Sequence, residues 1–195
     1  MRPEIRKTSL LLMLLLALAC GKDEQPGAGY SDAKSGKPQG TGTAVAPPAA
    51  QAPGTDVGST MPEYSAMWLD GSKFELAGRS NKVVLLNLWA TWCGPCRYEI
   101  PELQVLHDRY APRGFEVIGV SVDESGVESV RGFVKEQKMT YPIVLDAEGK
   151  LASMLQTSVL PTSIIVDRKG RVVWKKFGLI QPDDQDLKKA IESAL

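Results

Sequence analysis

Residues 83–101, VVLLNLWATWCGPCRYEIP, decide the fold of this chain. The first seven residues of this stretch are nearly all apolar, which is typical of a strand that is covered on both faces of a sheet. Apolar residues at helical spacing follow from about Cys96 to residue 110. The two cysteines, Cys93 and Cys96, are therefore expected between the end of a buried strand and the start of a helix.

This position determines what the cysteines can do. A thiol at a helix N-terminus faces unpaired backbone N–H groups and the positive end of the helix dipole, and both favour thiolate. Thiolate is the attacking species in disulfide exchange, so a lowered pKa would activate Cys93. Cys96, one turn further on and more buried, is expected to attack the resulting mixed disulfide and release the reduced partner. Gly94 and Pro95 make the turn tight, and Pro95 suits a first helical turn. We interpret the pair as a thiol–disulfide redox centre.

Zinc binding and a purely structural disulfide are the alternatives for two cysteines at this spacing. Zinc needs four ligands, usually supplied by a second pair of cysteines or histidines. The only histidine of the chain is His107, which we expect on the surface of a helix. A disulfide across two intervening residues closes too small a loop to stabilise a fold substantially. Redox activity is favoured over both alternatives, and we expect no metal and no other cofactor.

The N-terminus has the pattern of an export signal. Residues 1–19 consist of a basic head and an unbroken apolar run, which is shorter than the roughly 20 residues that a membrane-spanning helix needs. The run ends at Cys20, in a context that resembles the bacterial lipobox, where the cysteine is lipidated. A cleaved, soluble export signal is the alternative. Lipidation of Cys20 would leave the other two of the three cysteines as a single pair.

Residues 20–60 differ in composition from the rest of the chain. After Cys20 the segment contains no Leu, Ile, Phe, Met or Trp, and small and polar residues dominate it. Such a segment buries too little apolar surface to offset its conformational entropy. We expect a disordered tether with a root-mean-square span of roughly 35 Å, followed by one folded domain over residues 61–195. The chain carries 23 basic and 23 acidic side chains, and nothing suggests the clustered basic face that nucleic acids bind.

The domain alternates strands with helices, which predicts an α/β fold with a central mixed sheet flanked by helices. A hairpin is expected over residues 67–76, with Asp70–Gly71 as its turn. Further strands are expected over residues 83–89, 115–122, 141–145, 163–166 and 171–177. Helices are expected from about 96 to 110, with Pro101 as a candidate kink, and over residues 128–138, 150–155 and 183–195.

Two blocks of the sequence resemble a known family. Residues 87–101 resemble the active-site block of the thioredoxin superfamily and are most similar to its TlpA-like and ResA-like branch of membrane-tethered thiol–disulfide oxidoreductases. Residues 159–170, VLPTSIIVDRKG, resemble that family's cis-proline loop and following hairpin. The hairpin around Asp70–Gly71 resembles an N-terminal addition found in these branches. The resemblance spans about residues 62–195 and implies a thioredoxin-like fold with an added N-terminal β-hairpin.

The resemblance also implies a substrate-binding surface. Pro161 is expected in the cis form after Leu160, in a loop that offers backbone groups to an extended partner peptide by strand addition. An ordinary trans turn proline is the alternative. Trp92 is expected to shield the exposed side of the first cysteine, and Gly94 and Pro95 to contact the substrate with it.

The proton chemistry of the site has two interpretations. Thioredoxin keeps a buried aspartate where this chain has Asn87, so the proton of Cys96 must go elsewhere. Glu99 matches an acidic residue that ResA-like proteins place beside their thiols, which implies that Glu99 tunes the cysteine pKa values and moves protons. A solvated glutamate on the first helical turn, where acidic residues are favoured anyway, is the open alternative. We expect Arg97 to be solvated and Trp89 to pack in the core.

Taken with the signal, the resemblance implies a reductase for disulfides of exported proteins, with apocytochrome c as one candidate substrate. It would be held by the lipid on Cys20 on the extracytoplasmic side, which faces the periplasm in a two-membrane bacterium. It would draw electrons from a thiol donor in the membrane, because that compartment is oxidising. We expect a monomer.

Three alternatives to the reductase stay open. Oxidases of this superfamily often carry a histidine between the cysteines, and peroxiredoxins usually carry Thr or Ser where this chain has Ala90. A copper-delivery module would need wider cysteine spacing and a distant histidine.

Overall fold

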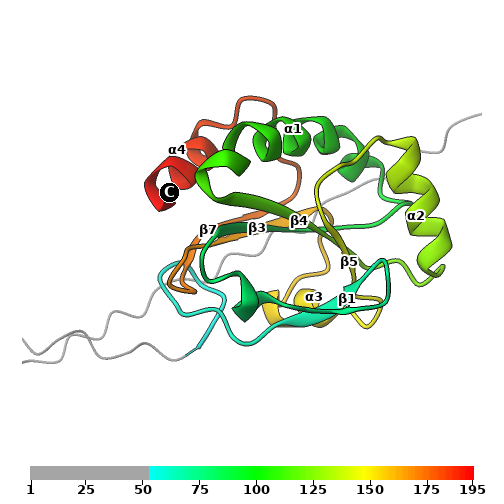
Figure 1. The fold of residues 1–195 in the computed structure, drawn as a ribbon, viewed down its shortest axis with the longest axis horizontal. Coiled ribbons are helices and arrows are strands. Elements are labelled where there is room, and N and C mark those ends of the chain that lie inside the picture. The colour runs from blue at the N-terminus through cyan, green and yellow to red at the C-terminus, as the bar shows by residue number, and fades with distance from the viewer. Residues whose placement is uncertain (1–52) are drawn as a thin grey trace, which may run out of the picture. The chain divides into compact units, whose positions relative to one another are not determined.

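The computed structural model describes residues 53–195, which form a thioredoxin-like α/β fold around a seven-stranded mixed sheet (Figure 1). The strand order is β2-β1-β5-β4-β3-β6-β7. The expected signal peptide over residues 1–19, the lipidated Cys20 and most of the expected tether lie outside the described residues. Within the described range, no helix combines the length and the apolar character that crossing a membrane requires.

Strand β3 (Val83–Trp89) lies inside the sheet and has the bounds that the sequence predicted. It pairs in parallel with β4 (Phe115–Ser121) and antiparallel with β6 (Thr162–Val166). Every residue of β3, β4 and β6 is buried. This burial explains the nearly continuous apolar run of β3, because helices or other chain segments cover both faces of the strand.

The expected N-terminal hairpin is confirmed. Strands β1 (Ser65–Trp68) and β2 (Lys73–Glu75) pair antiparallel, and β1 joins β5 (Ile143–Leu145) at one side of the sheet. The turn uses Asp70 as an acceptor for the Ser72 backbone N–H at 2.9 Å. Gly71 has φ = 87°, a left-handed conformation that suits glycine.

The helices also fall close to their expected ranges. Helix α1 (Gly94–Tyr110) begins two residues before Cys96 and continues through Pro101. The remaining elements are α2 (Val127–Glu136), α3 (Lys150–Leu155), β7 (Val172–Phe177), α4 (Gln185–Ala194) and the short 3₁₀ turns η1 (Leu76–Arg79) and η2 (Ala111–Arg113).

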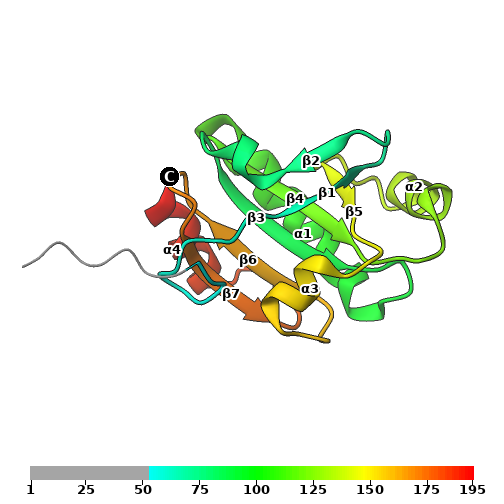
Figure 2. The same ribbon diagram turned by 90° about the horizontal axis from the view of Figure 1, so that it is seen from below.

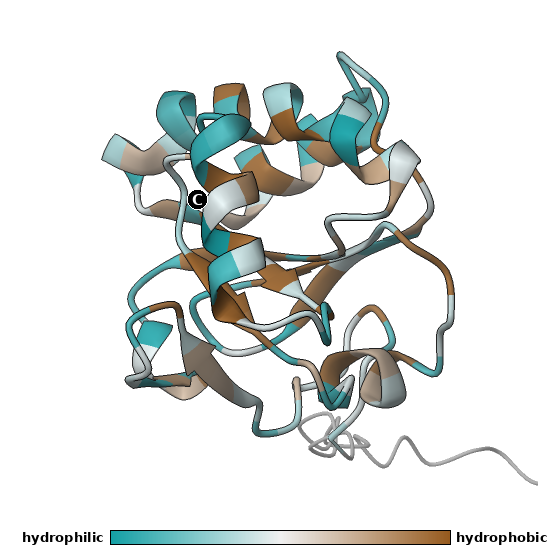
Figure 3. Cartoon of the chain, turned by 90° about the vertical axis from the view of Figure 1, so that its right-hand side faces the viewer, coloured by the Kyte–Doolittle hydropathy of each residue, from teal (hydrophilic) through white to brown (hydrophobic). Residues whose placement is uncertain are grey.

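The sheet separates two apolar cores. Helices α1, α2 and α4 share one core with the inward residues of the sheet, represented by Leu103, Phe133 and Leu187. Helix α3 and the N-terminal hairpin pack in the other core, represented by Leu151 and Phe74. Figure 2 shows α3 on the opposite side of the sheet from α1, and Figure 3 shows the apolar colour concentrated on the strands between these layers. The redox pair belongs to the first core.

Residues just before the expected domain boundary at residue 61 also pair with the sheet. The Gly58 N–H donates to Val172 O at 2.8 Å, and the Val172 N–H donates to Ser59 O at 2.9 Å. Strand β7 is the last strand of the sheet, so one of its sides has no neighbouring strand. Backbone pairing with this edge orders residues 54–60 although they are poor in large apolar side chains.

Gly119 in β4 is a point where the core leaves no room for a side chain. A methyl group there would lie 2.6 Å from Ile143 Cδ1 and 2.9 Å from Trp89 Nε1. We predict that Gly119→Ala lowers the free energy of unfolding by roughly 1–3 kcal/mol, as overpacking usually does. Urea unfolding measures this change. The control is Gly132→Ala in α2, where no heavy atom lies within 4 Å; it should raise stability by about 0.5–1 kcal/mol. Equal effects of the two substitutions would contradict this account.

Candidate active site

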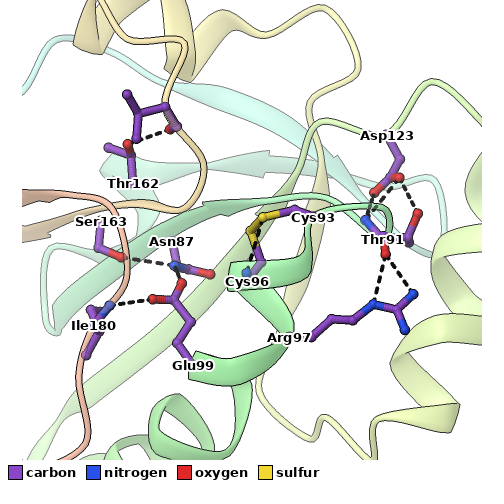
Figure 4. Close-up of a disulfide and its surroundings, with 11 residues drawn as sticks. Asn87, Thr91, Cys93, Cys96, Arg97, Glu99, Asp123, Thr162, Ser163 and Ile180 are labelled. Carbon is purple, nitrogen blue, oxygen red and sulfur yellow. Dashed lines mark hydrogen bonds between the residues drawn. A yellow bond between two sulfur atoms is a disulfide. The ribbon is translucent and has the colours of Figure 1, made fainter. Parts of the chain in front are cut away.

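Cys93 is the N-cap residue of α1 and forms a disulfide with Cys96 (Figure 4). Its backbone is extended, and its Sγ accepts a hydrogen bond from the Cys96 backbone N–H at 3.2 Å. Pro95 stands in the first turn, where a missing N–H leaves no partner unsatisfied. The sulfur of Cys93 is therefore already an acceptor for an unpaired helix N–H, the arrangement that stabilises a thiolate after reduction.

The two cysteines differ in accessibility as the sequence predicted. Cys93 is 5% exposed and Cys96 is 1% exposed. Trp92 is 70% exposed, and Gly94 and Pro95 are exposed beside it. The exposed residues next to the disulfide thus lie on the side of Cys93.

The loop before β6 contains the expected cis peptide bond between Leu160 and Pro161, so the trans alternative is wrong. Pro161 O accepts from the Gly178 N–H at 2.7 Å, and the Thr162 hydroxyl donates to Val159 O at 2.7 Å. Thr162 pairs with Leu88 of β3. Because β6 begins where β3 ends, the cis-proline loop and the redox motif leave the sheet at the same end.

Glu99 lies in the interior with 1% of its surface exposed, so the alternative of a solvated glutamate is wrong. Its two carboxylate oxygens accept from Asn87 Nδ2 at 2.6 Å and from the Ile180 N–H at 2.8 Å. Asn87 Nδ2 also donates to Ser163 Oγ at 3.0 Å. Burial raises the pKa of Glu99 from 4.5 to about 7, although the two N–H donors act in the opposite direction.

The structure also gives the surroundings of Trp89, Arg97 and His107. Trp89 is buried as expected. Arg97 is exposed as expected, but it donates two hydrogen bonds to Thr91 O. His107, expected on the surface, is half-buried, and its Nδ1 accepts from the Val117 N–H of β4 at 3.3 Å. Burial lowers the pKa of His107.

Ser163, Ile180 and Asp123 were not predicted from the sequence. Ser163 contacts Asn87 through the pairing of β6 with β3, and Ile180 contacts Glu99 through the path of the chain after β7. No local sequence pattern marks either residue. Asp123 is 3% exposed and accepts hydrogen bonds from Thr91. The sequence did contain a signal for Asp123, because ligand-binding and active-site residues of α/β sheets gather just after the carboxyl ends of buried strands.

The surroundings of the disulfide give no sign of a resident metal. Within residues 53–195 there is no group of three or more His, Cys, Asp or Glu side chains arranged to hold an ion. A cavity of about 310 Å³, lined by Met61, Leu76 and Val84 among others, lies toward the opposite end of β3. Neither cysteine of the redox pair lines this cavity.

The family assignment follows from a match of the Redoxin family model to residues 56–191. The chain belongs to the Redoxin family. It is 35% identical over 122 residues to a thiol-disulfide oxidoreductase ResA of Bacillus cereus, covering 63% of this chain and 70% of that protein. It is 34% identical over 137 residues to ResA of Geobacillus thermodenitrificans, covering 70% and 77%.

Solved structures agree with this Redoxin assignment. The thiol:disulfide interchange protein of Chlorobium tepidum TLS superposes with a TM-score of 0.60 at 28% identity, covering 74% of this chain and 99% of that one. A DsbF homologue of Corynebacterium diphtheriae gives 0.62 at 32% identity, covering 69% and 86%. This Redoxin-family chain is a ResA-like thiol–disulfide oxidoreductase with Cys93 and Cys96 as its redox pair.

The raised pKa of Glu99 predicts a pH-dependent stability. Between pH 4.5 and about 7 the folded protein binds a proton that the unfolded chain has released, so stability falls as pH rises through this window. Glu99→Gln removes the titrating group. We predict that the oxidised variant gains about 2–3 kcal/mol relative to the parent protein between pH 5 and pH 8. Urea unfolding at both pH values measures the difference. Parallel pH profiles would show that Glu99 titrates normally.

Proposed function

We propose that this oxidoreductase reduces disulfides in exported proteins, with apocytochrome c as one candidate substrate. The observation that supports this best is the buried Glu99 carboxyl on the same face of α1 as Cys96, with a pKa near neutrality (about 7). Residues three apart on a helix are neighbours. A reductase needs its second cysteine to lose a proton before it closes the disulfide, and a buried base that titrates near pH 7 suits that step.

The reaction has two exchanges. The Cys93 thiolate attacks one sulfur of the substrate disulfide, forms a mixed disulfide and displaces the other substrate sulfur as a thiolate. Glu99 takes the proton from the Cys96 thiol, and the Cys96 thiolate attacks Cys93 Sγ. The substrate leaves as a dithiol with both electrons, and Cys93 and Cys96 are oxidised to a disulfide. A dithiol donor in the membrane then reduces this pair for the next cycle.

The substrate surface consists of exposed groups around Cys93. Trp92 offers an exposed indole, and Gly94 has no heavy atom within 4 Å of where a side chain would begin, so a partner backbone can approach closely. The loop at Leu160 and Pro161 leaves the same end of the sheet, beside the exposed Val159. An extended substrate segment would pair with this loop by strand addition.

The cellular arrangement is part of the same proposal. Lipid on Cys20, after removal of residues 1–19, would hold the protein at the extracytoplasmic side of a membrane. The segment from Cys20 to about residue 53 would then act as the tether of a monomeric domain. This arrangement brings the redox pair close to a membrane thiol donor, which the oxidising compartment makes necessary.

The reduction potential of the pair tests the direction of exchange. We predict a value near −270 mV, as in thioredoxin, by equilibration with a glutathione buffer. A value near −120 mV would overturn the reductase in favour of an oxidase.

A trapping experiment identifies the substrates. Cys96→Ala should accumulate mixed disulfides on Cys93 with exported proteins, and mass spectrometry of these adducts identifies the trapped partners.

The role of Glu99 has its own test. We predict that Glu99→Gln slows closure of the mixed disulfide on the order of 10²-fold, because the variant has no base for the Cys96 proton. The first attack by Cys93 should change little. Stopped-flow fluorescence with a model disulfide separates the two steps. Glu102→Gln on the same helix is the matched control and should behave like the parent protein. Equal closure rates for both variants would remove Glu99 from the mechanism.

A further inference from the structure

Thr91, two residues before Cys93, is held at both ends by oppositely charged side chains (Figure 4). Its backbone N–H donates to both carboxylate oxygens of Asp123, at 3.1 and 3.0 Å, and its hydroxyl donates to Asp123 Oδ1 at 2.5 Å. On the other side, Thr91 O accepts from Arg97 Nε at 3.3 Å and Nη2 at 3.0 Å. A fixed anion and a fixed cation thus flank the chain that leads into the redox motif.

Asp123 is a buried carboxylate that has no cationic partner among residues 53–195. The residue is 3% exposed, and within residues 53–195 no Lys or Arg nitrogen forms an ion pair with it. Its carboxylate is held by neutral donors, which include the Ser121 hydroxyl at 2.7 Å. Water screens a buried charge weakly, so the field of Asp123 extends to neighbouring groups.

Arg97 is held on the other side by two contacts. Besides its hydrogen bonds to Thr91, its guanidinium lies over the ring of Phe133, with 4.9 Å from Cζ to the ring centroid. It belongs to the first turns of α1, one residue after Cys96. These contacts fix a positive charge beside the redox motif, which a freely moving surface arginine would not do.

We infer that Asp123 and Arg97 form an opposed pair of positioning residues that sets the ionisation of Cys93, and with it the balance between dithiol and disulfide. The disulfide is neutral, so both charges act mainly on the reduced form, where Cys93 carries a thiolate. Asp123 then disfavours the thiolate and Arg97 favours it. Stabilising the thiolate stabilises the reduced protein and makes the pair a stronger oxidant. This inference rests on the thiol–disulfide exchange of the chain and does not depend on which substrate it reduces.

Two single substitutions test the inference because they should act in opposite directions. We expect Asp123→Asn to lower the pKa of the Cys93 thiol by about half a unit to one unit, and Arg97→Gln to raise it by a similar amount. At pH 8, the equilibrium constant with glutathione should change by about threefold in each variant. Asp123→Asn should shift the equilibrium toward the dithiol, and Arg97→Gln should shift it toward the disulfide. The ultraviolet absorbance of the thiolate measures the pKa. The other buried titratable side chains on this side of the sheet, among them Glu99, Tyr110 and Tyr141, are not substituted in either variant.

Conservative and remote variants serve as controls. Arg97→Lys keeps the charge but loses the two-pronged contact with Thr91, so it should restore most of the parent pKa. Asp70→Asn, in the turn of the N-terminal hairpin, and Arg131→Gln, on α2, change the same charges elsewhere and should leave the equilibrium unaltered. The double variant Asp123→Asn/Arg97→Gln should lie within about twofold of the parent protein if the two effects oppose each other.

The outcomes separate this inference from a purely structural role. Shifts of the same sign in both single variants would mean that the contacts only hold the loop, and would overturn the inference. No shift in either variant would mean that solvent screens both charges, and would also overturn it. If Asp123→Asn does not fold, the comparison of Arg97→Gln with Arg97→Lys still tests the inference, because Arg97 is exposed and both variants lose the same guanidinium contacts with Thr91 and Phe133. A reduction potential that overturns the reductase proposal leaves these differences between variants unaffected.

Discussion

The burial of β3 between β4 and β6 is the constraint on which the site depends. The register places Trp89 opposite Ser121 and Leu88 opposite Thr162. At one end of the sheet, this brings together the redox motif after β3, the acidic residue after β4 and the cis-proline loop before β6. A slip by one residue would turn the side chains of β3 to the other face and separate these three segments.

The same strand brings a polar group into the core. Asn87 points to the side of α1, where it supports Glu99 together with the Ile180 N–H. Burial of a carboxyl is unfavourable unless the group is hydrogen-bonded or neutral. Glu99 accepts two hydrogen bonds, and near pH 7 part of the protein population carries it in the neutral form. The fold therefore keeps a proton-carrying group next to the redox pair at some expense of stability at higher pH.

The sequence predicts local structure well because the relevant signals are local. The apolar run of β3, the CxxC motif at a helix start and the block around Pro161 each lie within a few consecutive residues. The hydrogen bonds around Glu99 could not be predicted, since Ser163 reaches Asn87 through strand register and Ile180 reaches Glu99 through the path of the chain after β7. The pairing of residues 58 and 59 with β7 could not be predicted for a different reason: it uses backbone groups, which hydropathy does not report.

Two acidic side chains lie near the redox pair, and their surroundings suit them to different tasks. Glu99 accepts two N–H donors, and its burial brings its pKa to about 7, so it can exchange a proton on the inner side, at Cys96. Asp123 accepts hydrogen bonds from the Thr91 backbone and from the hydroxyl groups of Thr91 and Ser121. Under the proposed roles, the inner acid moves a proton while the outer one supplies a constant field at Cys93. Because these tasks fall to separate residues, the ionisation of the attacking sulfur can be adjusted without changing the group that accepts the proton of Cys96.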